Sequence, residues 1–137
     1  MSELSALKSA LAAEQAVVYG YGVVGAHLSG APRRHAMDRL TKHQTRRDEI
    51  SALITASGAV PPGGLPAYRL PFPVDDPAAA RRLAGSLEDG AAGAAWDLVA
   101  ATASRSPARR LAVGWLADAA VAASRWGAPP APFPGRP

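Results

Sequence analysis

The sequence contains no cysteine, which excludes disulfide bonds and thiolate metal ligands and leaves the redox character of its compartment open. It also lacks any uninterrupted apolar run of about 18 residues, so we expect no segment that spans a membrane. A secretion signal has a basic stretch followed by an apolar run, and residues 1–8 do not show this pattern. From these absences we expect a cytoplasmic protein that does not interact with a membrane.

Aromatic residues are few, at 6% of the 137 residues, although hydrophobic residues make up 48%. Much of the hydrophobic share is alanine, which has the highest helix propensity and lets helices pack closely. A chain of this length suits a single domain. The composition therefore favours an alanine-rich helical domain over a fold with a large core of bulky side chains.

The formal net charge is +4, and arginine carries most of the positive charge. Such a balance is compatible with binding to nucleic acid. A nucleic-acid surface needs its basic residues on one exposed face with aromatic residues between them. The basic residues of segment 32–57 are instead spread around the expected helix, with no aromatic residue among them. We keep nucleic-acid binding as an alternative that the sequence does not favour.

Four segments repeat apolar residues at the three- and four-residue spacing of an amphipathic helix. They are residues 2–29, 32–57, 77–104 and 107–126. Ser2 and the pair Asp76-Pro77 are typical of helix N-termini. Gly30 and Gly58 are typical of the position just after a helix. The short connections after the first and third segments predict two antiparallel helix hairpins.

The hairpins are joined by residues 58–76, whose five prolines exclude a helix. At about 3.1 Å per residue, such a proline-rich segment can run the whole length of a helix of about 39 Å. Apolar residues at nearly alternating positions, from Leu65 to Val74, predict that the segment lies against the helices. The expected fold is therefore all-α: residues 1–137 form one ferritin-like four-helix bundle with a long proline-rich crossover and a proline-rich tail at 127–137.

Ionisable residues occupy the middle of the second segment, where its apolar face predicts core positions. Counted in heptads from Ala36 and Leu40 to Ile50, the face places His43 and Arg47 at its centre. Acidic residues occur near the middle of the other three segments on or beside their apolar faces. They are Glu14, Glu88 and Asp118.

Buried carboxylates need partners, and one guanidinium can pair with more than one of them. We therefore predict a buried polar network in which Arg47 is the central cation. Its expected members are Glu14, His43, Arg47, Glu88 and Asp118. No catalytic residue can be assigned from the sequence.

Several stretches spread over the chain form a recognisable set. They are residues 12–22 (AAEQAVVYGYG), 43–48 (HQTRRD), 61–62 (PP), Tyr68 with 70–74 (LPFPV), 87–89 (LED) and 133–135 (FPG). Together they resemble an actinobacterial ferritin-like domain family of unknown function. The resemblance implies a ferritin-like bundle and no established activity.

Di-iron proteins of the ferritin-like group take one Glu from each of two helices and a Glu-x-x-His pair from each of the other two. Glu14 and Glu88 match the two lone glutamates. The pairs are eroded, because Leu40 stands where the Glu before His43 is needed, and Asp118 has no His three residues later. An arginine beside these residues repels divalent metal.

We therefore expect no cofactor and a non-catalytic structural or interaction protein. The first alternative is a metal-binding oxidase or iron-handling protein with iron or another divalent metal on the remaining ligands. These ligands would be Glu14, His43, Glu88 and Asp118. We also expect a homodimer, because Gly20, Gly22 and Gly25 would let a second copy approach the first two helices closely. The sequence identifies no small-molecule ligand.

Overall fold

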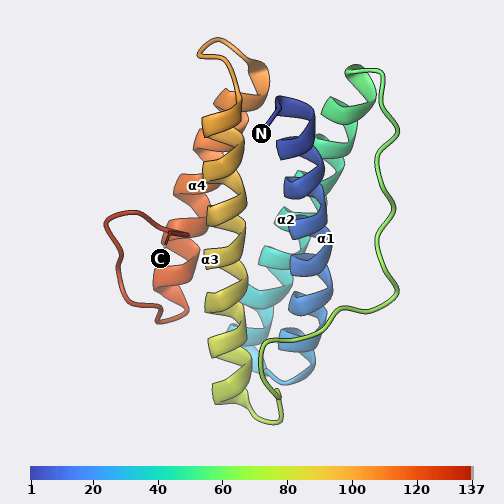
Figure 1. Cartoon of the computed structure of the whole chain (residues 1–137). Helices are drawn as coiled ribbons and strands as arrows, with labels where there is room; N and C mark the ends of the chain where they lie inside the picture. The colour runs from blue at the N-terminus through green and yellow to red at the C-terminus, as the bar shows by residue number, and fades with distance from the viewer. Residues whose placement is uncertain (137) are drawn as a thin grey trace.

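The chain folds into a four-helix bundle, which confirms the predicted all-α class (Figure 1). A computed structural model describes residues 1–136; Pro137, the last residue of the expected tail, lies outside the described residues. The helices are α1 (Glu3–Ala26), α2 (Gly30–Ala56), α3 (Pro77–Ala101) and α4 (Pro107–Arg125). No helix in the described part of the chain is long and apolar enough to cross a bilayer.

The helix ends follow from local capping. The Ser2 side chain accepts a hydrogen bond from the Ser5 amide at 3.1 Å, and Asp76 accepts one from the Ala79 amide at 2.7 Å. The helix expected to run to residue 104 ends earlier, because Thr102 adopts an extended backbone and its hydroxyl donates to the Leu98 carbonyl. Gly30, expected just after α1, begins α2 instead with a positive φ of 59°.

The crossover between α2 and α3 runs along the outside of the α1–α2 hairpin from one end of the bundle to the other (Figure 1). The Gln15 amide of α1 donates to the Pro62 carbonyl at 2.9 Å, and Val74 is buried at the other end of the segment. Leu70 and Phe72 pack partly buried against the core. Leu65 departs from the expected pattern and is 65% exposed.

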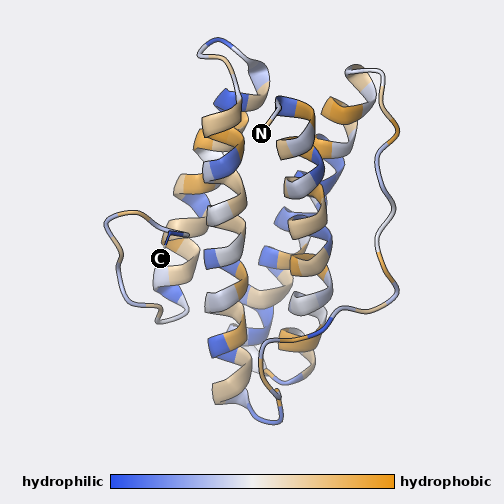
Figure 2. Cartoon of the chain, viewed as in Figure 1, coloured by the Kyte–Doolittle hydropathy of each residue, from blue (hydrophilic) through white to orange (hydrophobic). Residues whose placement is uncertain are grey.

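Two apolar clusters fill the interior, one toward each end of the bundle. The first includes Tyr21, Leu83 and Ala119, and the second includes Leu11, Ile50 and Leu98. Hydrophilic residues nonetheless occur along the middle of α2 (Figure 2). The bundle therefore has a polar layer between two apolar ones, and charges in that layer are far less screened than at the surface.

The close helix pairs are α1 with α2, α1 with α3, and α3 with α4. The side between α2 and α4 is bridged by long side chains: Arg39 and Arg46 of α2 both reach Asp118 of α4. The pair α2 and α4 is not among these close pairs, so at the site the two helices are joined by long side chains of α2.

Two of the three α1 glycines face the interior of the same chain. A Cβ on Gly20 would lie 2.6 Å from a Leu87 methyl, and one on Gly25 would overlap Met37 of α2. They permit packing within the bundle, so the reason given above for a dimer at α1 and α2 is wrong for these two positions. Gly22 alone of the three has open space around it.

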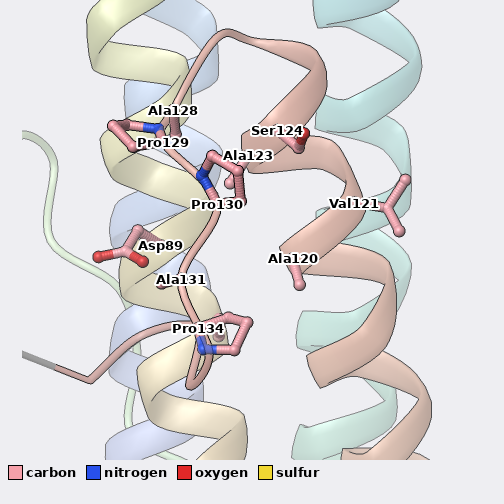
Figure 3. A pocket seen from close by; sticks show the side chains of 11 residues that line it. Asp89, Ala120, Val121, Ala123, Ser124, Ala128, Pro129, Pro130, Ala131 and Pro134 are labelled. Carbon is pink, nitrogen blue, oxygen red and sulfur yellow. The ribbon is translucent and has the colours of Figure 1, made fainter.

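The tail after α4 returns to the bundle and docks on α3. The Gly135 amide donates to Asp89, and Arg136 pairs with Asp97 at 2.9 Å. Gly135 has a positive φ of 78° and its Cβ position lies against the Gly93 backbone, so only glycine fits. Between the end of α4 and these anchors, the proline-rich chain passes along a pocket of about 250 Å³ lined mainly by alanine and proline (Figure 3).

The surroundings of the α1 glycines predict different changes in stability for two alanine substitutions. Gly22→Ala should raise the free energy of unfolding by about 0.5–1 kcal/mol, because alanine has the higher helix propensity and meets nothing. Gly20→Ala should gain less or lose stability, because Leu87 must move. Urea unfolding measures both. Equal stabilisation by the two substitutions would contradict the packing of Gly20 against α3.

Candidate functional site

Four of the five residues predicted for the buried network lie together in the polar layer. They are Glu14 of α1, His43 of α2, Glu88 of α3 and Asp118 of α4. His43 and Glu88 are completely buried, and Glu14 is 4% exposed. Asp118 is the member nearest the surface, with its side chain 28% exposed.

His43 joins α2 to both α1 and α3. Its Nδ1 lies 2.5 Å from Glu14 Oε2, and its Nε2 lies 2.9 Å from Glu88 Oε1. Ionised carboxylates only accept, so both contacts are hydrogen bonds when both ring nitrogens carry a proton, that is, when the ring is the imidazolium ion. Burial opposes this charge, but the hydrogen bonds to Glu14 and Glu88 outweigh it and raise the pKa of His43 above its usual 6.5.

Arg39 is the cation at the centre of the network. Its Nε and Nη2 bind the two oxygens of Glu88 at 2.8 and 2.9 Å. Its Nη1 and Nη2 also bind the two oxygens of Asp118 at 3.1 and 2.8 Å. One guanidinium thus holds α3 and α4 to α2 with paired, charge-assisted hydrogen bonds.

Arg46, two turns further along α2, completes the set of cations. Its Nη2 lies 2.8 Å from Asp118 Oδ2, and its Nη1 lies 3.6 Å from Glu14 Oε1. Its guanidinium also packs over the Trp115 ring at 5.8 Å, which is a favourable cation–π arrangement. Lys42 approaches Asp118 from the exposed side at 3.4 Å.

Arg47 is not part of the network, and its predicted central role is wrong. Its side chain is 35% exposed, and its Nε pairs with the neighbouring Asp48 at 3.0 Å. Arg39 and Arg46 take the role that the sequence assigned to it. They lie four residues before and three residues after His43, whereas the heptad count used three before and four after.

Both counts give a regular heptad pattern, so spacing alone could not choose between them. The face of α2 that is buried passes through Ala36, Arg39, His43, Arg46 and Ile50. This face points toward α3 and α4, whereas Arg47 points toward the crossover. The number of cations could have distinguished the two counts. The count through Arg39 and Arg46 places two arginines near the three acidic residues, whereas the count through Arg47 places only one.

Two aromatic residues extend the network, and no pattern in the sequence indicates a polar role for either. The Tyr21 hydroxyl donates to Glu88 Oε2 at 2.5 Å and accepts from Trp126 Nε1 at 3.0 Å. The Tyr21 ring also stacks on His43, with centroids 5.6 Å apart. Burial and the adjacent charge of Glu88 raise the pKa of Tyr21, so the phenol stays protonated and remains a donor.

The charges in the network cancel. Arg39, Arg46 and the His43 imidazolium are the three cations, and Glu14, Glu88 and Asp118 are the three anions. Burial alone would raise the pKa of Glu88, but hydrogen bonds from His43 and Arg39 lower it to about 2. Arg39 and Arg46 overcome burial in the same way and lower the pKa of Asp118. Glu88 and Asp118 are therefore paired while ionised.

A pocket of about 220 Å³ between α2 and α4 reaches the edge of this network. Arg39 and Asp118 line it together with His35, Lys42 and Arg125. It is the place where the network meets solvent, because Asp118 is its most exposed carboxylate. None of the network residues lines the pocket under the tail.

The residues of the polar layer do not fit a dinuclear metal centre. Metal ligands need free lone pairs, but both His43 nitrogens donate to carboxylates. Two fixed guanidinium charges lie among the carboxylates, and guanidinium cannot deprotonate to make room for a second cation. Within residues 1–136, no group of three His, Asp or Glu side chains is placed to hold a metal ion.

Loss of the central cation should be costly. Arg39→Leu should lower the free energy of unfolding by about 3–5 kcal/mol, because buried Glu88 loses its guanidinium partner and keeps only His43 and Tyr21. The matched change Arg47→Leu should stay within about 0.5 kcal/mol, because Arg47 makes only a surface pair. Chemical denaturation of the two variants tests this difference. Equal losses would show that Arg39 is not the central cation.

The free energy of unfolding should fall at both high and low pH. The pKa of His43 is raised, so its contribution is full below about pH 6.5 and is lost as pH rises through its folded pKa. The pKa of Glu88 is lowered from 4.5 to about 2. Its contribution to stability is therefore full above pH 4.5 and is lost as the pH falls toward 2. The free energy of unfolding should therefore be highest between these limits.

Urea unfolding across this pH range measures the profile, and nuclear magnetic resonance of the His43 ring nitrogens follows the group directly. His27 and His35 in the same spectrum serve as internal comparisons. An imidazole at His43 that loses its proton below pH 6.5 is the result that would contradict the doubly donating ring.

Comparison with known proteins places the chain in a family. Residues 6–137 match the model of the domain of unknown function DUF4439. The chain is also similar to a conserved hypothetical protein from Mycobacterium tuberculosis of solved structure, with 35% identity and a TM-score of 0.86 over 90% of this chain and 93% of that one. No curated protein matches it. The chain therefore belongs to the family of the domain of unknown function DUF4439.

Proposed function

We propose that this protein is a non-catalytic structural or interaction protein built on a ferritin-like bundle, with an ion network in place of a di-iron centre. The ferritin-like assignment is supported by the order of hairpin, full-length crossover and hairpin (Figure 1). It is also supported by Glu14 and Glu88, which lie on α1 and α3 as the lone glutamates of di-iron bundles do.

One observation supports the proposal that the polar layer binds no metal ion. Each of the six carboxylate oxygens of Glu14, Glu88 and Asp118 lies within 3.6 Å of a nitrogen of Arg39, His43 or Arg46. The charges of these three residues match those of the carboxylates. A metal ion could enter only by displacing a guanidinium, which would then be buried without a partner.

The network also weakens the nucleic-acid alternative. Arg39 and Arg46 contribute two of the positive charges that suggested a basic surface, but both are buried and paired inside the bundle. They are not available for phosphate groups. No feature of the described residues favours nucleic acid over a solvated surface.

The location and the oligomeric state are parts of the proposal that stay predictions. A homodimer would have to use a surface away from Gly20 and Gly25, and four apolar side chains of α4 and the tail are exposed. These are Leu111, Val113, Val121 and Phe133.

Metal analysis tests the proposal. Protein purified without chelator from iron- and manganese-supplemented cells should contain far less than one metal ion per chain by mass spectrometry. Addition of ferrous iron in air should give no oxidation above the protein-free rate, because the carboxylates are already paired.

The variant Arg46→Gln is the informative comparison, since it removes one cation while Arg39 keeps its pairs with Glu88 and Asp118. It should take up more metal than the wild type if guanidinium charge is what excludes the ion. One or two iron ions per wild-type chain that survive gel filtration would overturn the metal-free function.

A further inference from the structure

A second candidate site lies on the other side of α2, beneath the crossover. An open cleft of about 450 Å³ is lined by α1, α2 and the crossover. This volume lies in the range of about 300–1,000 Å³ that small-molecule sites occupy. The residues that matter are Tyr19 of α1, Arg47 and Ser51 of α2, and Tyr68 of the crossover.

The aromatic wall of the cleft is held in place by the fold. Gln15 fixes the crossover through its bond to the Pro62 carbonyl at 2.9 Å. The Tyr68 hydroxyl accepts from the Leu65 amide at 2.9 Å, which closes a tight turn of the crossover. The Tyr19 and Tyr68 rings then pack at 5.7 Å with an angle of 50° between their planes. A ligand would therefore meet a formed surface, which lowers the entropic cost of binding.

Arg47 lines the same cleft and has a donor edge that no residue within 1–136 occupies. Its Nε donates to Asp48 at 3.0 Å, and this is the polar contact that the described residues provide for it. The edge formed by Nη1 and Nη2 is left for another acceptor. That edge has the spacing that binds the two oxygens of a carboxylate or phosphate at once. Ser51, one turn further along α2, adds a hydroxyl beside it.

We propose that this cleft binds a small organic anion with a planar apolar body. The carboxylate or phosphate group pairs with the Nη1–Nη2 edge of Arg47, and the planar body packs on Tyr19 and Tyr68. Asp48 keeps the guanidinium oriented through its Nε while leaving the binding edge open. The site uses none of the residues of the buried network, so it does not depend on the metal-free function proposed above.

Calorimetric titration of the full chain with benzoate and with phenyl phosphate tests the site and separates the two kinds of anion. Benzyl alcohol keeps the ring without the charge, and acetate and inorganic phosphate keep the charge without the ring. At least one ring-bearing anion should bind more tightly than all three of these controls, because only it uses both Arg47 and the tyrosine pair.

Matched variants locate the binding. Arg47→Gln should weaken the ring-bearing anion by about tenfold or more, because the charged fork is lost. Arg34→Gln removes an exposed arginine of the same helix outside the cleft and should change nothing. Tyr68→Leu should weaken the anion severalfold while leaving the melting temperature near that of the wild type.

Three results would overturn the proposal. The first is that neither ring-bearing anion binds at millimolar concentration. The second is that Arg47→Gln binds as tightly as the wild type, and the third is that acetate or inorganic phosphate binds as tightly as its ring-bearing counterpart. None of these outcomes bears on the metal content, so the two proposals can fail separately.

Discussion

The pairing of the Arg39 guanidinium with Glu88 and Asp118 is the interaction on which the centre of this bundle depends. Glu88 is completely buried between two apolar clusters, where an unpaired carboxylate would be too costly to retain. Arg39 neutralises it and at the same time reaches α4. The side of α2 that faces inward and the hydrogen bond from Tyr21 to Glu88 are consistent with that requirement.

We infer that such a network selects one arrangement of the helices more than it raises the free energy of unfolding. The desolvation cost of burying the charges offsets most of the energy gained from their attraction. Each cation here joins particular helices: His43 links α1, α2 and α3, while Arg39 links α2, α3 and α4. A bundle whose apolar core is largely alanine has few bulky side chains to fix its register. The ion pairs supply that fixation at the middle of every helix.

The fold could be predicted from the sequence because each of its signals is local. Proline marks the crossover, caps mark helix starts, and apolar spacing marks the four helices. The carboxylates and His43 could be found for the same reason, since they interrupt apolar faces. The choice of cation could not, because two heptad counts through His43 fit equally well, and only the position of α4 distinguishes them. Tyr21 was missed because an apolar ring on a core face gives no sign that its hydroxyl meets Glu88.

Arg46 and Arg47 show how a single step along a helix separates two roles. Successive residues of an α-helix differ by about 100° around its axis, so neighbouring arginines must face different surroundings. Arg46 is turned inward and is 4% exposed, with carboxylates of α1 and α4 as partners. Arg47 is turned toward the crossover, and no acceptor within residues 1–136 bonds to its outer edge. The same side chain is therefore structural at one position and, at the next, available to a ligand from outside the chain.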